Sequence, residues 1–415
     1  MKRAFVLALS IVCLLVISVG SVASSAAQPK EFNLGILLPL TGTFAAVAKT
    51  QQEGVLLAVD EINAAGGLNM PWGKVPVKYQ VADDEASLDV GVRRFMYMAG
   101  GGVNAVVGQT WAPLAYSINE MVKQYPLPYF PVAVLAKEAF MKGKLSNYTW
   151  AVAYSPWTVG YMAGSAAINT LGKKKIFFLA RSDSWGWDIW EGVKAAAKQY
   201  GGEIVGYEEA PLGTSDFVTI LQKVRAAKPD VFMSAQFAGD AIALLKQTYD
   251  MGLYKEMTIF NSFLTNVVAQ GLPAEAVNGL YGMHYFYWDM TGFPDKEVAK
   301  LASQYVEAYK KKYGYPPDSY ATIAYIAAKH LFDVVQKVGT FDAAKISDYM
   351  QKNPDFMTVK GPAKWREDHS AVFKYAAFLV KGKSPKERKS DWDLFTIVGS
   401  QGGDSVMPPL KDLGY

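Results

Sequence analysis

The stretch from Asn33 to Leu68 contains a complete strand–loop–helix unit, and this unit most constrains what the chain can fold into. Its first part, Leu34 to Leu38, is an apolar run that is too short for a globular helix and is typical of a buried strand. Pro39 and Gly42 interrupt the run. From about Lys49 the apolar residues recur with a helical period, on one face made of Val55, Val59 and Ile62. A buried strand that leads directly into a helix is the first unit of an α/β domain, although any α/β protein contains such units.

The same strand–helix alternation returns along the chain. The first series has further strands at Val75–Val81, Ala105–Val107 and Tyr129–Val132. A second series begins near Trp150, with strands predicted at Ile176–Ala180, Ile204–Tyr207, Val231–Ala235 and Thr258–Phe260. The helix after the first of these strands is predicted over Trp190–Tyr200. Because repeated βα units build parallel sheets that are covered on both faces, we predict two similar α/β lobes. The tail after about Gly279 changes character several times and could return to complete both lobes.

The N-terminus has the pattern of an export signal. Lys2 and Arg3 precede the apolar run Ala4–Val22, and Ser25 and Ala27 fit the small residues of a signal peptidase site. We therefore expect residues 1–27 to be a signal peptide that is cleaved near Ala27, which places the protein in the periplasm. An uncleaved membrane anchor is the alternative.

The single cysteine, Cys13, lies inside this apolar run. After cleavage the chain would have no disulfide, no thiolate nucleophile and no cysteine metal site. The remaining length exceeds the roughly 250–300 residues that one core supports, which favours two domains. The formal charge of +4 includes the two positive residues of the signal segment, and no basic block indicates nucleic acid as a partner.

Catalytic motifs are not evident. The three histidines, His284, His330 and His369, are far apart in the sequence, and neither the H-E-x-x-H zinc pattern nor the G-x-S-x-G serine pattern occurs. We interpret His330, in a long predicted helix, as a core or surface residue. The acidic run Asp83–Glu85 could form a metal or acid–base pair, but a solvated turn is the more frequent use of such a run. A catalytic site assembled from distant residues stays open.

Aromatic residues follow several predicted strands. Trp111, Trp185 and Trp187 fall in loops just after strands, where α/β proteins form ligand sites. Aromatic walls with a few polar groups suit a small, largely apolar ligand. The alternative is that these tryptophans pack the lobes together or lie on the surface.

Four segments carry a family resemblance. They are GILLPLTG with EGVLLAVDEINAAGG near the start, then AVVGQ, DSWG and PLGTSDFVTILQKVRAAKPDVF in that order. Together they resemble type I periplasmic substrate-binding proteins, specifically the leucine/isoleucine/valine-binding branch that serves ABC importers. The resemblance extends over nearly the whole chain after the signal segment.

The resemblance implies an α/β fold with two doubly wound parallel-sheet lobes joined by three crossovers, near Ala151, Gly282 and Gly361. Lobe 1 would be residues 28–150 plus 283–360, and lobe 2 would be residues 151–282 plus 361–415. The ligand would be closed between the lobes by a hinge movement, and a membrane permease with its ATPase would receive it. We expect a monomer that needs no cofactor and no metal.

The candidate ligand-binding residues come from the family's positions and from the predicted strand ends. They are Val47, Thr110, Trp111, Ala112, Leu135, Arg181, Trp185, Phe237, Ser262 and Tyr320. The sequence departs from the amino-acid binders at three of them, since Ala112 and Leu135 stand where those proteins have hydroxyls and Ser262 stands where they have an acid.

A zwitterion needs donors for its carboxylate and an acid for its ammonium, because an unpaired buried charge costs several kcal/mol. We therefore expect an aromatic or otherwise bulky apolar ligand, possibly a carboxylate, rather than an α-amino acid. The helix start at Trp111–Ala112 and the guanidinium of Arg181 are the candidate partners of a carboxylate; a surface position for Arg181 is the alternative. Branched-chain amino acid import, a periplasmic ligand sensor and a secreted enzyme remain the alternative functions.

Overall fold

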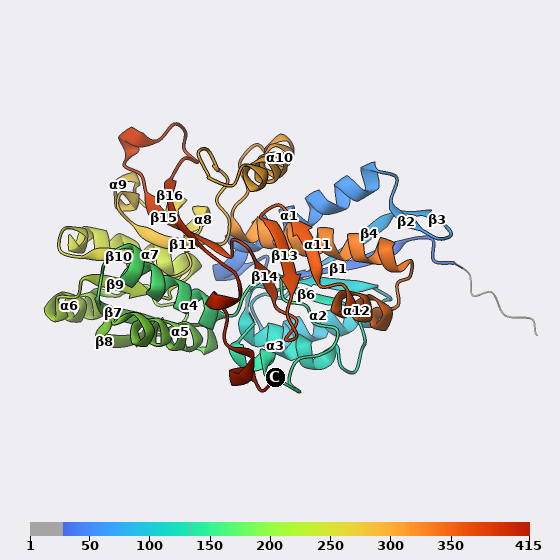
Figure 1. Cartoon of the computed structure of the whole chain (residues 1–415), viewed down its shortest axis with the longest axis horizontal. Coiled ribbons are helices and arrows are strands. Elements are labelled where there is room, and N and C mark those ends of the chain that lie inside the picture. The colour runs from blue at the N-terminus through green and yellow to red at the C-terminus, as the bar shows by residue number, and fades with distance from the viewer. Residues whose placement is uncertain (1–27, 134) are drawn as a thin grey trace, which may run out of the picture.

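The computed structural model describes residues 28–133 and 135–415, which fold into two α/β lobes (Figure 1). The predicted signal peptide, residues 1–27, lies outside the described residues. The predicted fold class is confirmed, because each lobe is built around its own sheet of mainly parallel strands. Over the described ranges, no helix combines the length and the apolar character needed to cross a membrane.

Lobe 1 is built on a four-stranded parallel sheet with the order β4-β1-β5-β6. Its strands are β1 (Phe32–Leu38), β4 (Val77–Asp83), β5 (Ala105–Gly108) and β6 (Tyr129–Pro131). Its helices are α1 (Ala45–Ala64), α2 (Leu88–Gly100), α3 (Ala112–Met121), α10 (Lys296–Tyr313), α11 (Ser319–Val338) and α12 (Ala343–Lys352). A hairpin, β2 (Leu68–Met70) with β3 (Gly73–Val75), follows α1.

Lobe 2 is built on a seven-stranded sheet with the order β16-β15-β11-β10-β9-β7-β8. The strands are β7 (Lys175–Arg181), β8 (Glu203–Ala210), β9 (Val231–Ser234), β10 (Thr258–Asn261), β11 (Tyr281–His284), β15 (Ala377–Gly382) and β16 (Phe395–Gln401). The five from β7 to β11 pair in parallel, whereas β15 and β16 join as antiparallel neighbours. The helices are α4 (Pro156–Ser165), α5 (Ser184–Tyr200), α6 (Val218–Ala227), α7 (Ala238–Asp250), α8 (Asn266–Gln270) and α9 (Ala274–Val277).

The chain passes between the two sheets after β6, after β11 and before β15. A small third sheet precedes the last passage and contains β12 (Asp355–Thr358), β13 (Gly361–Trp365) and β14 (Ala371–Phe373). It packs on lobe 1, where Trp365 Nε1 donates to His330 Nε2 of α11 at 3.0 Å. This packing favours a third crossover close to Ala376 rather than Gly361; the numbered lobe boundaries stay a prediction.

One predicted helix start was wrong. The sequence pattern placed the helix of the second series from Trp190, but α5 begins at Ser184 because the carboxylate of Asp183 accepts hydrogen bonds from Trp185 N and Gly186 N. Such a cap stabilises the first helical turn. Trp185 therefore projects from a fixed helix start and not from a loop.

Two glycines allow helices to approach closely. At Gly54 in α1, an added Cβ would lie 2.1 Å from the carbonyl oxygen of Ala321 in α11. At Gly160 in α4, it would lie 1.9 Å from the carbonyl oxygen of Ile189 in α5. Real Cβ atoms do not come so near to backbone atoms, so each contact depends on the absence of a side chain.

We expect Gly54→Ala to lower the free energy of unfolding by about 1–3 kcal/mol, because α1 and α11 must move apart to admit the methyl group. Urea unfolding of the purified protein measures this change. Gly100→Ala is the matched control, since Gly100 lies in a helix of the same lobe and an added Cβ would meet nothing within 4 Å. Equal stability of the two variants would contradict the packing argument.

Candidate functional site

The strand orders of the two sheets place four loops at one gap between the lobes. In lobe 1 the order changes direction between β1 and β5, and in lobe 2 it changes direction between β7 and β9. The loops that leave neighbouring strands at such a switch point diverge to opposite faces of the sheet and leave a crevice, where α/β proteins bind ligands. The segments after these four strands are therefore the expected walls of a site.

A cavity lies at this point between the lobes. Its lining residues are Phe44, Thr110, Ala112, Arg181, Trp185, Phe237 and Tyr320. Phe44 follows β1, Thr110 and Ala112 follow β5, Arg181 and Trp185 stand at the end of β7, Phe237 follows β9, and Tyr320 belongs to the first turn of α11. The space open to the centre of a water molecule is about 10 Å³, which is room for about one water.

Aromatic rings from both lobes meet across the cavity. Phe44 of lobe 1 stacks on Phe237 of lobe 2, with ring centres 6.1 Å apart. Tyr320 approaches Phe237 at 5.4 Å, and Trp185 approaches it at 6.2 Å. Trp185 is held in place because its Nε1 donates to the carbonyl oxygen of Ala235 at 2.8 Å. The lobes are thus in contact through a fixed aromatic wall.

Arg181 is the charged residue of this wall. It is only 4 % exposed, and its Nε donates to Asp183 Oδ2 at 2.8 Å. Arg181 donates no other hydrogen bond among the described residues. Its two terminal nitrogens are therefore free for another acceptor. The guanidinium carbon lies 5.8 Å from the centre of the Trp185 ring. Arg181 is therefore buried at the cavity and is not the surface residue of the alternative reading.

Thr110 fixes the loop after β5 through a buried side-chain hydrogen bond. The cap position of α3 belongs to Trp111, and the Thr110 hydroxyl donates to Gln51 Oε1 at 2.5 Å. Gln51 is buried in α1 and donates through Nε2 to the carbonyl oxygen of Val132. This chain of bonds fixes the loop after β5 and leaves the first amide groups of α3 beside the cavity wall at Ala112.

Four of the candidate residues lie away from the cavity lining. Val47 belongs to the first turn of α1 and is buried in the core, and Leu135 is buried in a small cluster with Phe140. Trp111 is half-buried and packs against the apolar cluster of α2 and α3, and its Nε1 has no hydrogen-bond partner among the described residues. Ser262 is fully buried, and its hydroxyl also has no partner. The other six candidates line the cavity together, and their ligand-binding role stays a prediction.

The sequence analysis missed Phe44. Its position in the sequence indicated a role at the site, because it directly follows Thr41–Thr43, the segment after the first predicted strand. The prediction named Val47, one helical turn further along, which turns into the core instead. An aromatic residue so close to the strand end was the better candidate.

The lining residues combine aromatic rings with the polar groups of Thr110 and Arg181. No histidine, cysteine, lysine or carboxylate is among the lining residues, and the hydroxyl of Thr110 is bonded to an amide and not to a base. His330 is half-buried in lobe 1, where loss of contact with solvent lowers its pKa to about 3. Burial also lowers the pKa of His284 to about 3. The lowered pKa values favour the neutral form of both histidines.

The acidic run Asp83–Glu85 fixes a turn. Asp83 accepts hydrogen bonds from Leu40 N and Thr41 Oγ1, each at 2.8 Å, and so holds the loop after β1. Asp84 is fully buried, and burial raises the pKa of its carboxyl group to about 7. No group of three or more potential metal ligands occurs within the described ranges.

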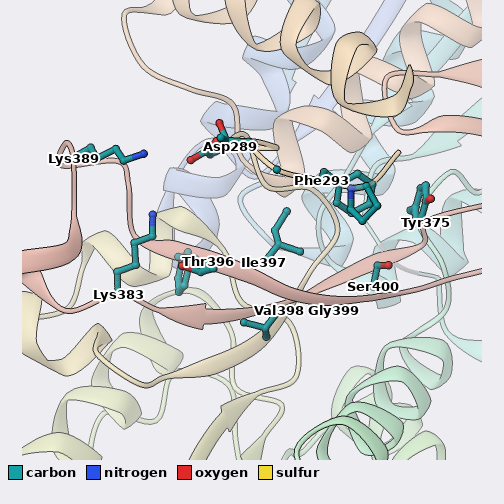
Figure 2. Close-up of a pocket in the computed structure, with 14 residues that line it drawn as sticks. Asp289, Phe293, Tyr375, Lys383, Lys389, Thr396, Ile397, Val398, Gly399 and Ser400 are labelled. Atoms are coloured by element: carbon teal, nitrogen blue, oxygen red, sulfur yellow. The ribbon is translucent and has the colours of Figure 1, made fainter. Parts of the chain in front are cut away.

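A second, larger pocket lies beside the crossover segments (Figure 2). It has about 510 Å³ open to the centre of a water molecule, and it runs between the crossover loop 289–294 and the edge strand β16. Lys383, on its wall, is already paired with Asp393. Because this pocket lies on the outer edge of the lobe 2 sheet and not at a switch point, we do not assign the ligand site to it.

The chain belongs to the periplasmic binding protein family, whose model matches residues 31–385. A similar relative is the Leu/Ile/Val-binding protein homolog 7 of Brucella abortus, which is 25 % identical over 80 % of this chain and 84 % of that protein. The resemblance to the branched-chain amino acid binders is thereby confirmed.

Two solved structures illustrate the range within this fold. A solute-binding protein of an ABC transporter from Rhodopseudomonas palustris, in complex with 3,4-dihydroxybenzoic acid, is 22 % identical with a TM-score of 0.78, over 92 % of this chain and all of that chain. The substrate-binding protein LivJ from Streptococcus pneumoniae, in complex with isoleucine, is 21 % identical with a TM-score of 0.76, over 90 % and 99 % of the two chains.

The buried carboxyl group of Asp84 predicts a pH effect on stability. In the unfolded chain this group releases its proton near pH 4, whereas the folded chain keeps it to about pH 7. The folded state therefore binds more protons in that window, and its free energy of unfolding falls as the pH rises through it. Below pH 4 the contribution is fully present.

We expect Asp84→Asn to lose this dependence, so that its free energy of unfolding rises by roughly 4 kcal/mol relative to that of the parent between pH 4 and pH 8. Urea unfolding across this range is the measurement. Glu85→Gln, in the same turn but exposed, is the control and should keep the parent's profile. Parallel profiles for Asp84→Asn and the parent would show that Asp84 is not held protonated.

Proposed function

We propose that the protein is the extracytoplasmic receptor of an ABC importer and that it captures a small aromatic or bulky apolar carboxylate between its lobes. The observation that carries this proposal is the inter-lobe cavity, in which aromatic rings surround one buried arginine. Family membership supports the receptor role, and delivery to a permease with its ATPase follows from that role. We further propose that the protein acts as a monomer in the periplasm after cleavage near Ala27.

Arg181 is the proposed partner of the ligand's carboxylate. Its terminal nitrogens can form a bidentate pair with a carboxylate. Such a pair is stronger and more directional than the bond that a lysine side chain would give to the same carboxylate. The Asp183 carboxylate orients the guanidinium through Nε and leaves that face free. The amide groups at the start of α3 can share the negative charge, because a helix N-terminus favours anions.

The ring of the ligand would lie among Phe44, Phe237 and Tyr320. Offset and edge-on contacts between rings contribute about 0.5–1.5 kcal/mol each beyond burial. Because the cavity has room for about one water, such a ligand enters only when the lobes separate or the rings turn. Contacts to both lobes then favour the closed state, which a permease can recognise.

An α-amino acid is the second candidate, because the Brucella abortus relative is named as a Leu/Ile/Val-binding protein homolog. The cavity fits it less well. The wall residues include no carboxylate for an ammonium group, and the Asp183 carboxylate is occupied by Arg181 and by the first amides of α5. An unpaired ammonium in this place would cost several kcal/mol.

A thermal-shift screen tests the ligand class. The protein from residue 28 onward is refolded once to remove carried-over ligand and is then mixed with benzoate, 3,4-dihydroxybenzoate, phenylacetate, leucine, isoleucine or valine. A ligand at a hundred times its dissociation constant stabilises the fold by about 2.7 kcal/mol. A rise with the aromatic acids supports the proposal, whereas a rise with the amino acids alone would replace it by the second candidate.

Calorimetric titration of Arg181→Met with the best aromatic acid tests the role of the arginine. We expect the dissociation constant to rise about 10- to 100-fold, since a hydrogen-bonded pair with a charged group is lost. Arg225→Met is the control, because Arg225 lies on the surface of the same lobe in an ion pair with Glu256. An unchanged dissociation constant for Arg181→Met would remove Arg181 from the site.

A further inference from the structure

The last residues of the chain leave lobe 2 and return to lobe 1. We call residues 402–415 the C-terminal strap. It starts at the end of β16, which is the outermost strand of the lobe 2 sheet. In Figure 1 it runs past α4 and ends beside α3, where the C-terminus is marked. The lobes are therefore linked once more, in addition to the three crossovers.

The first part of the strap is attached to lobe 2. Gln401, just before it, donates through Nε2 to the carbonyl oxygen of Met162 in α4 at 2.8 Å. Met407 is buried, and the hydroxyl of Thr158 in α4 donates to its sulfur at 3.7 Å. Two bonds join this part to the small third sheet instead. Gly403 N donates to the carbonyl oxygen of Phe373 at 2.9 Å, and Lys364 of β13 pairs with Asp404 at 2.8 Å, although both of these side chains are half-exposed and the pair contributes little. Gln401 and Met407 are therefore the residues that attach this end to α4 of lobe 2.

The second part is attached to lobe 1. Leu413 is 1 % exposed and is buried with Ala115 of α3, Leu135 and Phe140. Its carbonyl oxygen accepts a hydrogen bond from the amide of Lys142 at 2.8 Å. The ammonium of Lys142 also lies 5.7 Å from the ring centre of Tyr415, where a cation is attracted to the ring. One buried leucine and one backbone bond thus fasten the strap.

We propose that the strap restrains the opening of the lobes and that the burial of Leu413 provides this restraint. The crossovers act as hinges, but the strap is fixed to α4 at one end and to the α3 side at the other. Rotation of one lobe away from the other must therefore stretch the segment between Met407 and Leu413 or pull Leu413 from its apolar surroundings. Burial of a leucine side chain is favourable, so the restraint adds to the stability of the state in which the lobes touch.

This inference rests on the two-lobe fold and not on the identity of the ligand, so its test needs none. The described residues include no cysteine, which allows spin labels at Tyr97→Cys in α2 and Gln222→Cys in α6. Both side chains are exposed, one on each lobe. Double electron–electron resonance then gives the distribution of distances between the lobes for the labelled protein and its variants.

Two strap variants, Leu413→Ala and a deletion of residues 409–415, should add a population with longer distances. We expect the ratio of separated to touching lobes to rise about tenfold or more, because a large-to-small change at a buried leucine removes most of its packing. Lys411→Ala is the matched control, since Lys411 lies in the strap but is exposed, and it should leave the distribution unchanged. Circular dichroism checks that each variant is folded.

Hydrogen exchange at the amide of Lys142 reports on whether its hydrogen bond to Leu413 is intact. Its protection should fall in both strap variants and stay in Lys411→Ala. Should the deletion fail to fold, Leu413→Ala carries the test. If Lys142 loses protection while the distance distribution stays that of the parent, the strap merely covers lobe 1 and the proposal is overturned.

Discussion

The reversal of strand order in each parallel sheet is the constraint on which this structure depends. The first strand of each lobe lies between the second and the third, so consecutive helices cover opposite faces and their loops part at one place. In lobe 1 this place lies after β1 and β5, and in lobe 2 after β7 and β9. The crossovers turn these two places toward each other, and for that reason residues as distant in sequence as Phe44 and Phe237 can stack.

Much of this arrangement was accessible from the sequence. Apolar runs bounded by glycine, proline and acidic residues located most of the parallel strands, and the residues just after those strands include six that line the cavity. The resemblance added the pairing of the lobes. The local sequence pattern was enough to place these residues, because ligands of α/β sheets bind at the carboxyl ends of the strands and the pattern locates those ends.

The remainder could not be derived, because it depends on contacts between distant segments. Nothing in the residues around Leu413 indicates that Leu135 and Ala115 will bury it. Trp365 was assigned to lobe 2, yet it packs against His330 of lobe 1, and only the closure of the third small sheet brings the two together. The start of α5 was missed for a different reason. The carboxylate of Asp183 accepts hydrogen bonds both from the first amides of α5 and from Arg181, and this double role is not visible in the sequence.

This shared carboxylate explains how a cation can be buried beside an apolar wall. The charge of an arginine that is 4 % exposed must be compensated by a partner. Asp183 is this partner, because its carboxylate accepts a hydrogen bond from Nε of Arg181. The pair has no net charge, but it presents donors to the cavity and no acceptor, because the oxygens of Asp183 are taken by Arg181, Trp185 and Gly186. A carboxylate can use such a surface, whereas an ammonium group cannot. In the function that we propose, the geometry that makes the burial of Arg181 tolerable also favours anions with an aromatic body.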